Sequence, residues 1–185
     1  YFYDTLYDSI YVWTNGVLSP GAYHYITLGN DTIPRNYGGY NRLIAPLWED
    51  LHCLGPGRVK YQTFGSAPNR YCVISYDSII FYNNFAESTL CFQVILYEGG
   101  NIVYQYKNVV QNYYRSNGVG ATVGIENGTG TIGLCYYYGY EYSTPPRMRP
   151  PGNLLSNGRA ILFYRPDVGV THIGAPVGQV DSGLV

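Results

Sequence analysis

The stretch 88–107, STLCFQVILYEGGNIVYQYK, alternates in polarity on both sides of a glycine pair. A period of two is typical of half-buried strands, and the glycines favour a hairpin between them. A three-residue loop at 98–100, with Gly100 in the left-handed conformation, keeps the two faces distinct. A two-residue loop would mix them, so the pattern favours the longer loop. The predicted core face is Phe92, Val94, Leu96, Ile102, Tyr104 and Tyr106.

Further strand patterns recur along the chain with turn residues between them. An Asn-Gly pair at 15–16 predicts a hairpin between the apolar runs 10–14 and 17–19. The run 43–48 contains Pro46, so we expect that strand at a sheet edge or a bulge. No stretch has the spacing and caps of a helix. Other predicted strands are 58–64, 71–80, 121–126, 131–138 and 160–164, with a looser edge strand at 1–9.

Regular strands without helices predict an all-β protein, an antiparallel and jelly-roll-like β-sandwich. The chain of 185 residues is long enough for one such domain, predicted at 1–165, followed by an extended segment at 166–185. This segment has few charges to keep it solvated. It could add as a strand to a neighbouring copy, or link to another domain. Its apolar residues include Val168, Val170, Ile173, Val177 and Val180.

Tyrosine dominates the composition, with 23 residues against 6 Phe and 2 Trp. Charged residues make up only 12% of the chain, about half the usual share. The net charge of -1 provides no basic surface for nucleic acid or anionic membrane. No apolar run is long enough to span a bilayer, so we expect no membrane insertion. A neutral, aromatic surface favours contact with other molecules.

The four cysteines lack Cys-x-x-Cys spacing and allow three pairings. The composition is typical of a secreted protein, and the chain begins at a tyrosine, as expected of a mature or trimmed product. We therefore expect two disulfides, with Cys53–Cys72 and Cys91–Cys135 favoured. In the predicted register Cys91 lies opposite Lys107 on the non-core face, which also pairs Gln93 with Gln105. The alternative is four free buried thiols in a cytosolic protein.

Candidate catalytic and metal-binding groups are scattered. His24, His52 and His172 have no ligand spacing to one another. The segment 49–53, with two acids, a histidine and a cysteine, comes nearest to a metal cluster, but neighbouring strand residues point to opposite faces. No phosphate-binding loop or nucleophile elbow occurs. We therefore expect a non-enzymatic protein without a cofactor.

The sequence also offers aromatic and glycosylation candidates. In a regular strand the even-numbered tyrosines of 136–142 share one face and Tyr137 lies on the other. The shared face could bind carbohydrate or a second subunit, because exposed tyrosine suits both. Sequons at Asn30 and Asn127 are candidate glycosylation sites in a secreted protein. The candidate glycan-contact residues are Tyr136, Tyr138, Tyr140 and Tyr142.

A set of motifs occurs in an order that resembles the nidogen-type (NIDO) extracellular domain. The motifs are IYVWTNGVLSPG, LIAPLWEDL, GRVKYQ, YCVISYDSI, FQVILYEGGNIVYQY and ATVGIENGTGTIGL, between residues 10 and 164. The set is also similar to secreted bacterial β-sandwich domains found beside proteases and surface repeats. Such domains usually have a tryptophan where this chain has Tyr76. The resemblance implies an extracellular structural or adhesive role and transfers no catalytic residues.

These observations predict an extracellular structural protein that partners with copies of itself. In this interpretation it is a subunit of a surface filament or sheath and uses the segment 166–185 for strand exchange. The alternative is a carbohydrate-binding or adhesion module of a larger secreted surface protein, with polysaccharide as its partner. A secreted hydrolase is disfavoured because the sequence offers no nucleophile and base pair.

Overall fold

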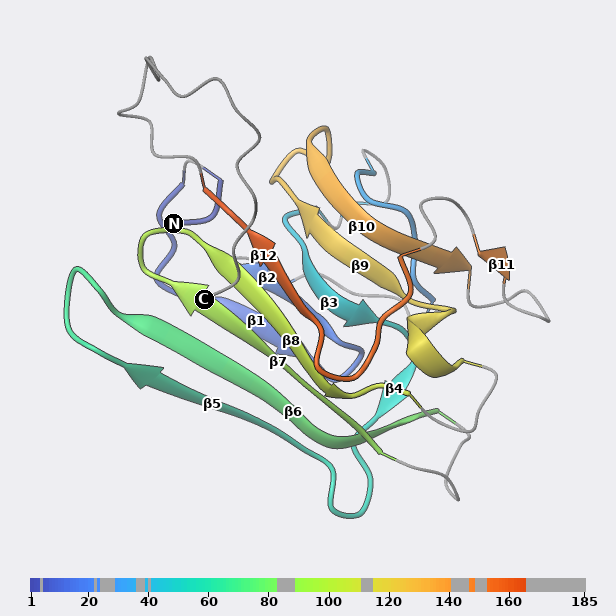
Figure 1. Cartoon of the computed structure of the whole chain (residues 1–185). Coiled ribbons are helices and arrows are strands. Elements are labelled where there is room, and N and C mark those ends of the chain that lie inside the picture. The colour runs from blue at the N-terminus through green and yellow to red at the C-terminus, as the bar shows by residue number, and fades with distance from the viewer. Residues whose placement is uncertain are drawn as a thin grey trace, which may run out of the picture.

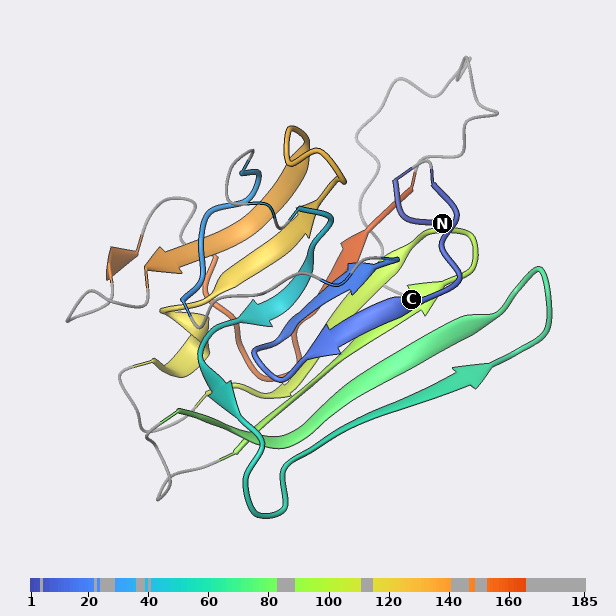
Figure 2. The same ribbon diagram turned by 180° about the vertical axis from the view of Figure 1, so that it is seen from behind.

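The protein is a sandwich of two antiparallel six-stranded sheets, as the sequence predicts (Figure 1). Their inner faces share one hydrophobic core, and Figure 2 shows the same sandwich from behind. The computed structural model describes residues 1–3, 5–21, 23, 29–35, 39, 41–82, 89–110, 115–140, 147–148 and 153–165. The segment 166–185 lies outside the described residues, so its predicted role stays a prediction.

The first sheet has the order β1-β2-β3-β9-β10-β11, and its inner face packs on the second. In the second sheet, the order is β12-β8-β7-β6, and both β4 and β5 pair with the other edge of β6. The first sheet consists of β1 (Ile10–Trp13), β2 (Val17–Pro20), β3 (Ile44–Trp48), β9 (Thr122–Glu126), β10 (Gly133–Tyr140) and β11 (Arg147–Met148). The second consists of β4 (Leu51–His52), β5 (Arg58–Phe64), β6 (Tyr71–Phe81), β7 (Leu90–Tyr97), β8 (Ile102–Asn108) and β12 (Ala160–Phe163).

The β7–β8 hairpin has the predicted register and loop. Its last pair is closed by a hydrogen bond of 3.0 Å from the Tyr97 amide to the Asn101 carbonyl, and Gly100 has a φ of 99°. The predicted core residues face one another across the two strands. Five of them are buried and Leu96 is half-buried. One detail was wrong, because a bulge at the start of β7 places Cys91 opposite Asn108 instead of Lys107.

Two other strand predictions need correction. Residues 1–9 form no strand in their described part, only a single bridge between Phe2 and Thr5. The strand that contains Pro46 is β3, which lies inside the first sheet between β2 and β9. A register shift between Ala45 and Trp48 accommodates the proline. The bulge alternative is therefore confirmed and the edge alternative is wrong.

Three buried tyrosines of the second sheet connect it to the first, and we name them the tyrosine crossbars. Each side chain lies in the core and donates its hydroxyl hydrogen to a backbone carbonyl of the opposite sheet. Burial raises the pKa of all three hydroxyls, so they remain donors. The bonds are Tyr76 to Trp13 (2.9 Å), Tyr104 to Gly124 (2.8 Å) and Tyr106 to Pro46 (2.6 Å).

The outer face of the first sheet is covered by residues 29–35, which we name the strap. Ile33 of the strap packs with Leu43, Ala45 and Trp48 in a second hydrophobic cluster. Polar contacts hold both ends of the strap. Asn30 makes them at one end and Arg35 at the other. The Asn30 amide donates to the carbonyl oxygens of Gly120 (2.7 Å) and Gly139 (2.6 Å), the Arg35 amide donates to the Glu126 carboxylate, and Arg35 pairs with Asp31 (2.9 Å).

We expect Tyr104→Phe to lower the free energy of unfolding by about 1–2 kcal/mol, because the Gly124 carbonyl loses a buried donor. The matched control is Tyr164→Phe, whose ring is 61% exposed, with an expected change within about 0.5 kcal/mol. Urea denaturation of both variants measures the difference. Equal effects would show that the crossbar does not stabilise the fold.

We expect the stability of the protein to fall as pH rises from about 4.5 to about 7. Burial, as the main cause, raises the pKa of Glu126 from its ordinary 4.5 to about 7. The folded state therefore holds this proton more tightly than the unfolded state, and ionisation at higher pH destabilises it by up to about 3 kcal/mol.

Glu126→Gln should remove this slope and raise the melting temperature above pH 7, while leaving it nearly unchanged at pH 4.5. Glu98→Gln is the control, because hydrogen bonds from Arg70 lower the pKa of Glu98 to about 2 and its loss should bring no gain at high pH. Thermal melts across this pH range test both. An unchanged slope in Glu126→Gln would contradict the assignment.

Candidate functional site

The four cysteines are free, so neither predicted disulfide is formed. Cys91 lies on the outer face of the second sheet, where its thiol contacts Asp77. Cys135 packs against the cluster on the outer side of the first sheet. Both thiols point away from the core, as predicted, but they belong to opposite layers and the whole sandwich separates them.

The Cys53–Cys72 pair was wrong for a different reason. Cys53 lies beside Gly57, near the Ser78 carbonyl of β6. Cys72 lies at the other end of the same strand, in register with Leu96. The rise of a strand between residues 72 and 78 is about 20 Å, far beyond the reach of a disulfide.

The tyrosines of β10 do not form the predicted flat platform. A register shift between Cys135 and Tyr137 makes Tyr136 an extra residue in the ladder. Tyr137 points into the core, and Tyr136, which was predicted on the opposite face, also packs partly against the core. Tyr138 is half-buried and lies opposite Thr122. The side chain of Tyr140 and all of Tyr142 lie outside the described residues.

The two sequons have different environments. Asn30 is buried, and its amide nitrogen donates to Gly120, Thr122 and Gly139, so it has no room for a glycan in this fold. Asn127 lies at the turn before β10, where its side-chain oxygen accepts from the Thr131 amide at 3.0 Å. Glycosylation at Asn127 stays a prediction, and the Asn30 site was wrong.

The acidic segment before β4 does not assemble a metal site in the described part of the chain. Glu49 is buried and pairs with Arg115 at 3.3 Å. Burial raises the pKa of Asp50, and His52 stacks on the Tyr82 ring. His24 and His172 lie outside the described residues.

The candidate functional site is a gap at the β1 edge of the sandwich. The Tyr76 crossbar bonds the Trp13 carbonyl, so β1 lies directly over β6. β5 pairs with β6 on the side away from β7. Because β1 is the last strand of the first sheet on this side, β5 lies beyond it and has no strand of the first sheet over it. Neighbouring strands lie about 4.8 Å apart, so one further strand beside β1 would cover β5. We name this space the open strand position.

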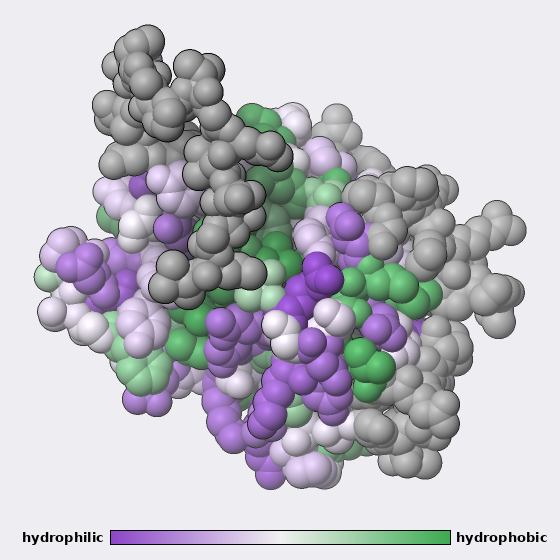
Figure 3. Space-filling model, in the orientation of Figure 1, coloured by the Kyte–Doolittle hydropathy of each residue, from purple (hydrophilic) through white to green (hydrophobic). Residues whose placement is uncertain are grey.

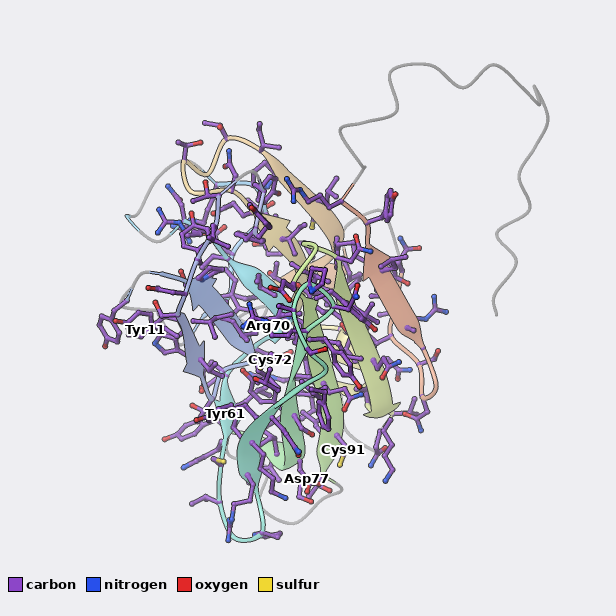
Figure 4. All side chains as sticks on the ribbon, turned by 90° about the vertical axis from the view of Figure 1, so that its left-hand side faces the viewer. Tyr11, Tyr61, Arg70, Cys72, Asp77 and Cys91 are labelled. Atoms are coloured by element: carbon purple, nitrogen blue, oxygen red, sulfur yellow. The ribbon has the colours of Figure 1, made fainter. Side chains whose placement is uncertain are left out.

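Tyr61 shows that the core-side face of β5 is uncovered. Tyr61 lies opposite Ile74, which is fully buried, and residues directly opposite in an antiparallel pair project on the same side. The Tyr61 side chain is nevertheless 81% exposed. Figure 4 shows it pointing to the side on which β1 and Tyr11 lie. Val59 and Thr63 share this face of β5 by the alternation of the strand; Val59 packs partly against the core, whereas Thr63 is exposed.

A cleft of about 330 Å³ enters the space between the sheets at one end of the open strand position. Its wall includes apolar residues from both sheets, and its rim includes Thr63 of β5. Arg70 at the rim donates to Glu98 through its backbone amide and Nε, each at 3.0 Å. These bonds keep Glu98 ionised. The apolar wall is formed by Phe2, Ile10, Ile44, Leu96 and Ile102.

The edge of β1 differs from that of β5 in its charge. Exposed edge strands are usually protected from pairing by charged residues, especially lysine. β5 carries Arg58 and Lys60, whereas β1 reads IYVW without a charge. Among the described residues, no strand pairs with the outer edge of β1. The short edge strand β12 is also uncharged, and among the described residues Leu134 of β10, which lies opposite buried Ile125, is 55% exposed as well, so an uncovered core-side position is not confined to the β1 edge.

Sequence reasoning placed β1 and β5 correctly as strands but missed the open strand position. The alternation of Val59, Tyr61 and Thr63 with polar residues was visible in the sequence. It marks one face of β5 as the core side. The lateral offset of the two sheets, which leaves that face open, depends on contacts between strands that are distant in sequence.

A family model described as NIDO related matches residues 1–148, which cover both walls of the open strand position. The chain belongs to the NIDO-related family. No curated protein and no solved structure matches this NIDO-related chain. The family indicates an extracellular domain. Within the described residues, no helix has the length and apolarity needed to cross a bilayer.

Proposed function

We propose that this NIDO-related protein is an extracellular, non-enzymatic structural subunit that assembles with copies of itself. The segment 166–185 of one copy adds as a strand to β1 of the next copy and covers the core-side face of β5. The open strand position is the observation that supports this proposal, because it combines an uncharged free edge with an uncovered apolar face. Repeated from copy to copy, such a contact does not close and gives a filament.

The sequence of the segment suits this position. An added strand gains affinity from main-chain hydrogen bonds and specificity from alternate side chains. Val168 and Val170 alternate as such a strand requires, and twenty residues exceed the seven of β5 that need cover. The apolar cleft beside Ile10 and Ile44 can receive one of these side chains. A net charge of -1 opposes the approach of two copies only weakly.

Deleting every residue after Tyr164 tests the assembly. We expect the full-length protein to form filaments visible by electron microscopy, and the truncated protein to remain monomeric by light scattering. A synthetic peptide of residues 166–180 should bind the truncated protein. Truncated protein that still forms the same filaments would overturn the proposal. A full-length monomer that loses thermal stability on truncation would show that each copy fills the position with its own segment.

A pair of variants on β5 tests where the segment binds. Tyr61→Asp introduces a charge on the core-side face, and Gln62→Asp introduces the same charge on the outer face, since Gln62 lies opposite Val73. Both side chains are exposed, so both variants should fold. We expect Tyr61→Asp to weaken peptide binding about tenfold or more, which corresponds to 1.4 kcal/mol, and Gln62→Asp to leave it nearly unchanged. Equal effects would exclude the open strand position as the binding site.

A further inference from the structure

A second concave surface lies on the outer face of the second sheet, away from the open strand position. It is a groove of about 500 Å³ that crosses β6, β7, β8 and the start of β12. Figure 3 shows this face of the molecule, where hydrophilic side chains gather over the lower half. The polar residues that line the groove are Ser75, Asp77, Gln93, Gln105, Lys107 and Arg159.

The floor of the groove is a row of residues in register across four strands. Ser75 lies opposite Gln93, Gln93 opposite Gln105, and Gln105 opposite Ala160. The two amides in the middle are joined by a hydrogen bond of 2.6 Å from Gln93 to Gln105. Small side chains at both ends of the row leave the hollow above it. Each glutamine amide still has hydrogen-bonding capacity for a ligand, since an amide carries two donors and an acceptor.

The charged groups of the groove leave an excess of positive charge. Asp77 is ion-paired with Lys60 at 3.3 Å, and a hydrogen bond from Lys60 lowers its pKa. Lys107 and Arg159 form no ion pair among the described residues. Arg159 instead donates to the Tyr136 hydroxyl at 2.8 Å, which holds its guanidinium at the side of the groove. Both cations are exposed to solvent.

We propose that this groove binds an acidic polysaccharide, a polymer of uronic acid units. The glutamine amides and the Ser75 hydroxyl match the vicinal hydroxyls of a sugar, which both donate and accept. Lys107 and Arg159 match its carboxylates by charge. The aromatic residues at the groove, Tyr76, Phe92 and Tyr106, point into the core and offer no ring face. The groove therefore lacks the stacking surface that a neutral sugar would need. Its positive charge favours acidic sugars instead.

Oligogalacturonate and a neutral cello-oligosaccharide of the same length, titrated into the full chain by calorimetry, test the chemistry. We expect binding of the acidic oligosaccharide only, with affinity that falls as salt rises. No binding, or equal binding of the neutral sugar, would overturn the proposal.

Three variants with equal loss of charge test the location. Lys107→Gln and Arg159→Gln should each weaken binding of oligogalacturonate about five- to tenfold. Arg165→Gln is the matched control, because Arg165 stacks on Tyr1 at the other end of β12 and does not line the groove. Equal weakening by all three variants would show a response to net charge alone and would overturn the site. The groove residues are not those of the open strand position, so loss of binding here leaves the assembly experiments unaffected.

Discussion

The tyrosine crossbars determine how the two sheets lie on each other. A buried hydroxyl without a partner is costly, so each crossbar must meet a carbonyl of the opposite sheet. The three carbonyls belong to β1, β3 and β9, which fixes the lateral offset as well as the spacing of the layers. With β1 held over β6 by Tyr76, no strand of the first sheet can cover β5. The Tyr76 hydrogen bond is thus one of the contacts between the layers that hold β1 over β6 and leave the open strand position.

The period of two was sufficient to predict the strands and the register of the β7–β8 hairpin. It identifies which side of a strand is apolar, and the loop length then fixes the pairing. It could not predict the bulges at Cys91 and before Tyr137, because an extra residue in a ladder leaves no mark on polarity. The first bulge made the predicted partner of Cys91 wrong. The second bulge made the predicted tyrosine platform wrong.

The cysteines and the sequons show a second limit of sequence reasoning. Cys91 and Cys135 were placed correctly away from the core, but polarity does not reveal which of two layers a strand enters. Asn30 was predicted to lie in a loop, as a candidate glycosylation site. In the fold it is buried at one end of the strap, where its amide nitrogen makes three hydrogen bonds that replace those to water. Polar residues that close the outer face of a sheet resemble a loop in the sequence.

The open strand position lies beside β1 and over β5, whereas the groove crosses β6, β7, β8 and the start of β12, so the two sites do not compete. Alternate side chains of β5 point to opposite faces, so Tyr61 faces the open strand position and Gln62 faces the outer surface. The strap closes the outer face of the first sheet, which leaves the second sheet to carry the groove. Copies joined through β1 and β5 would therefore keep every groove accessible. A filament of such copies would bind a long polymer through many weak sites at once, and its avidity would greatly exceed the affinity of one groove.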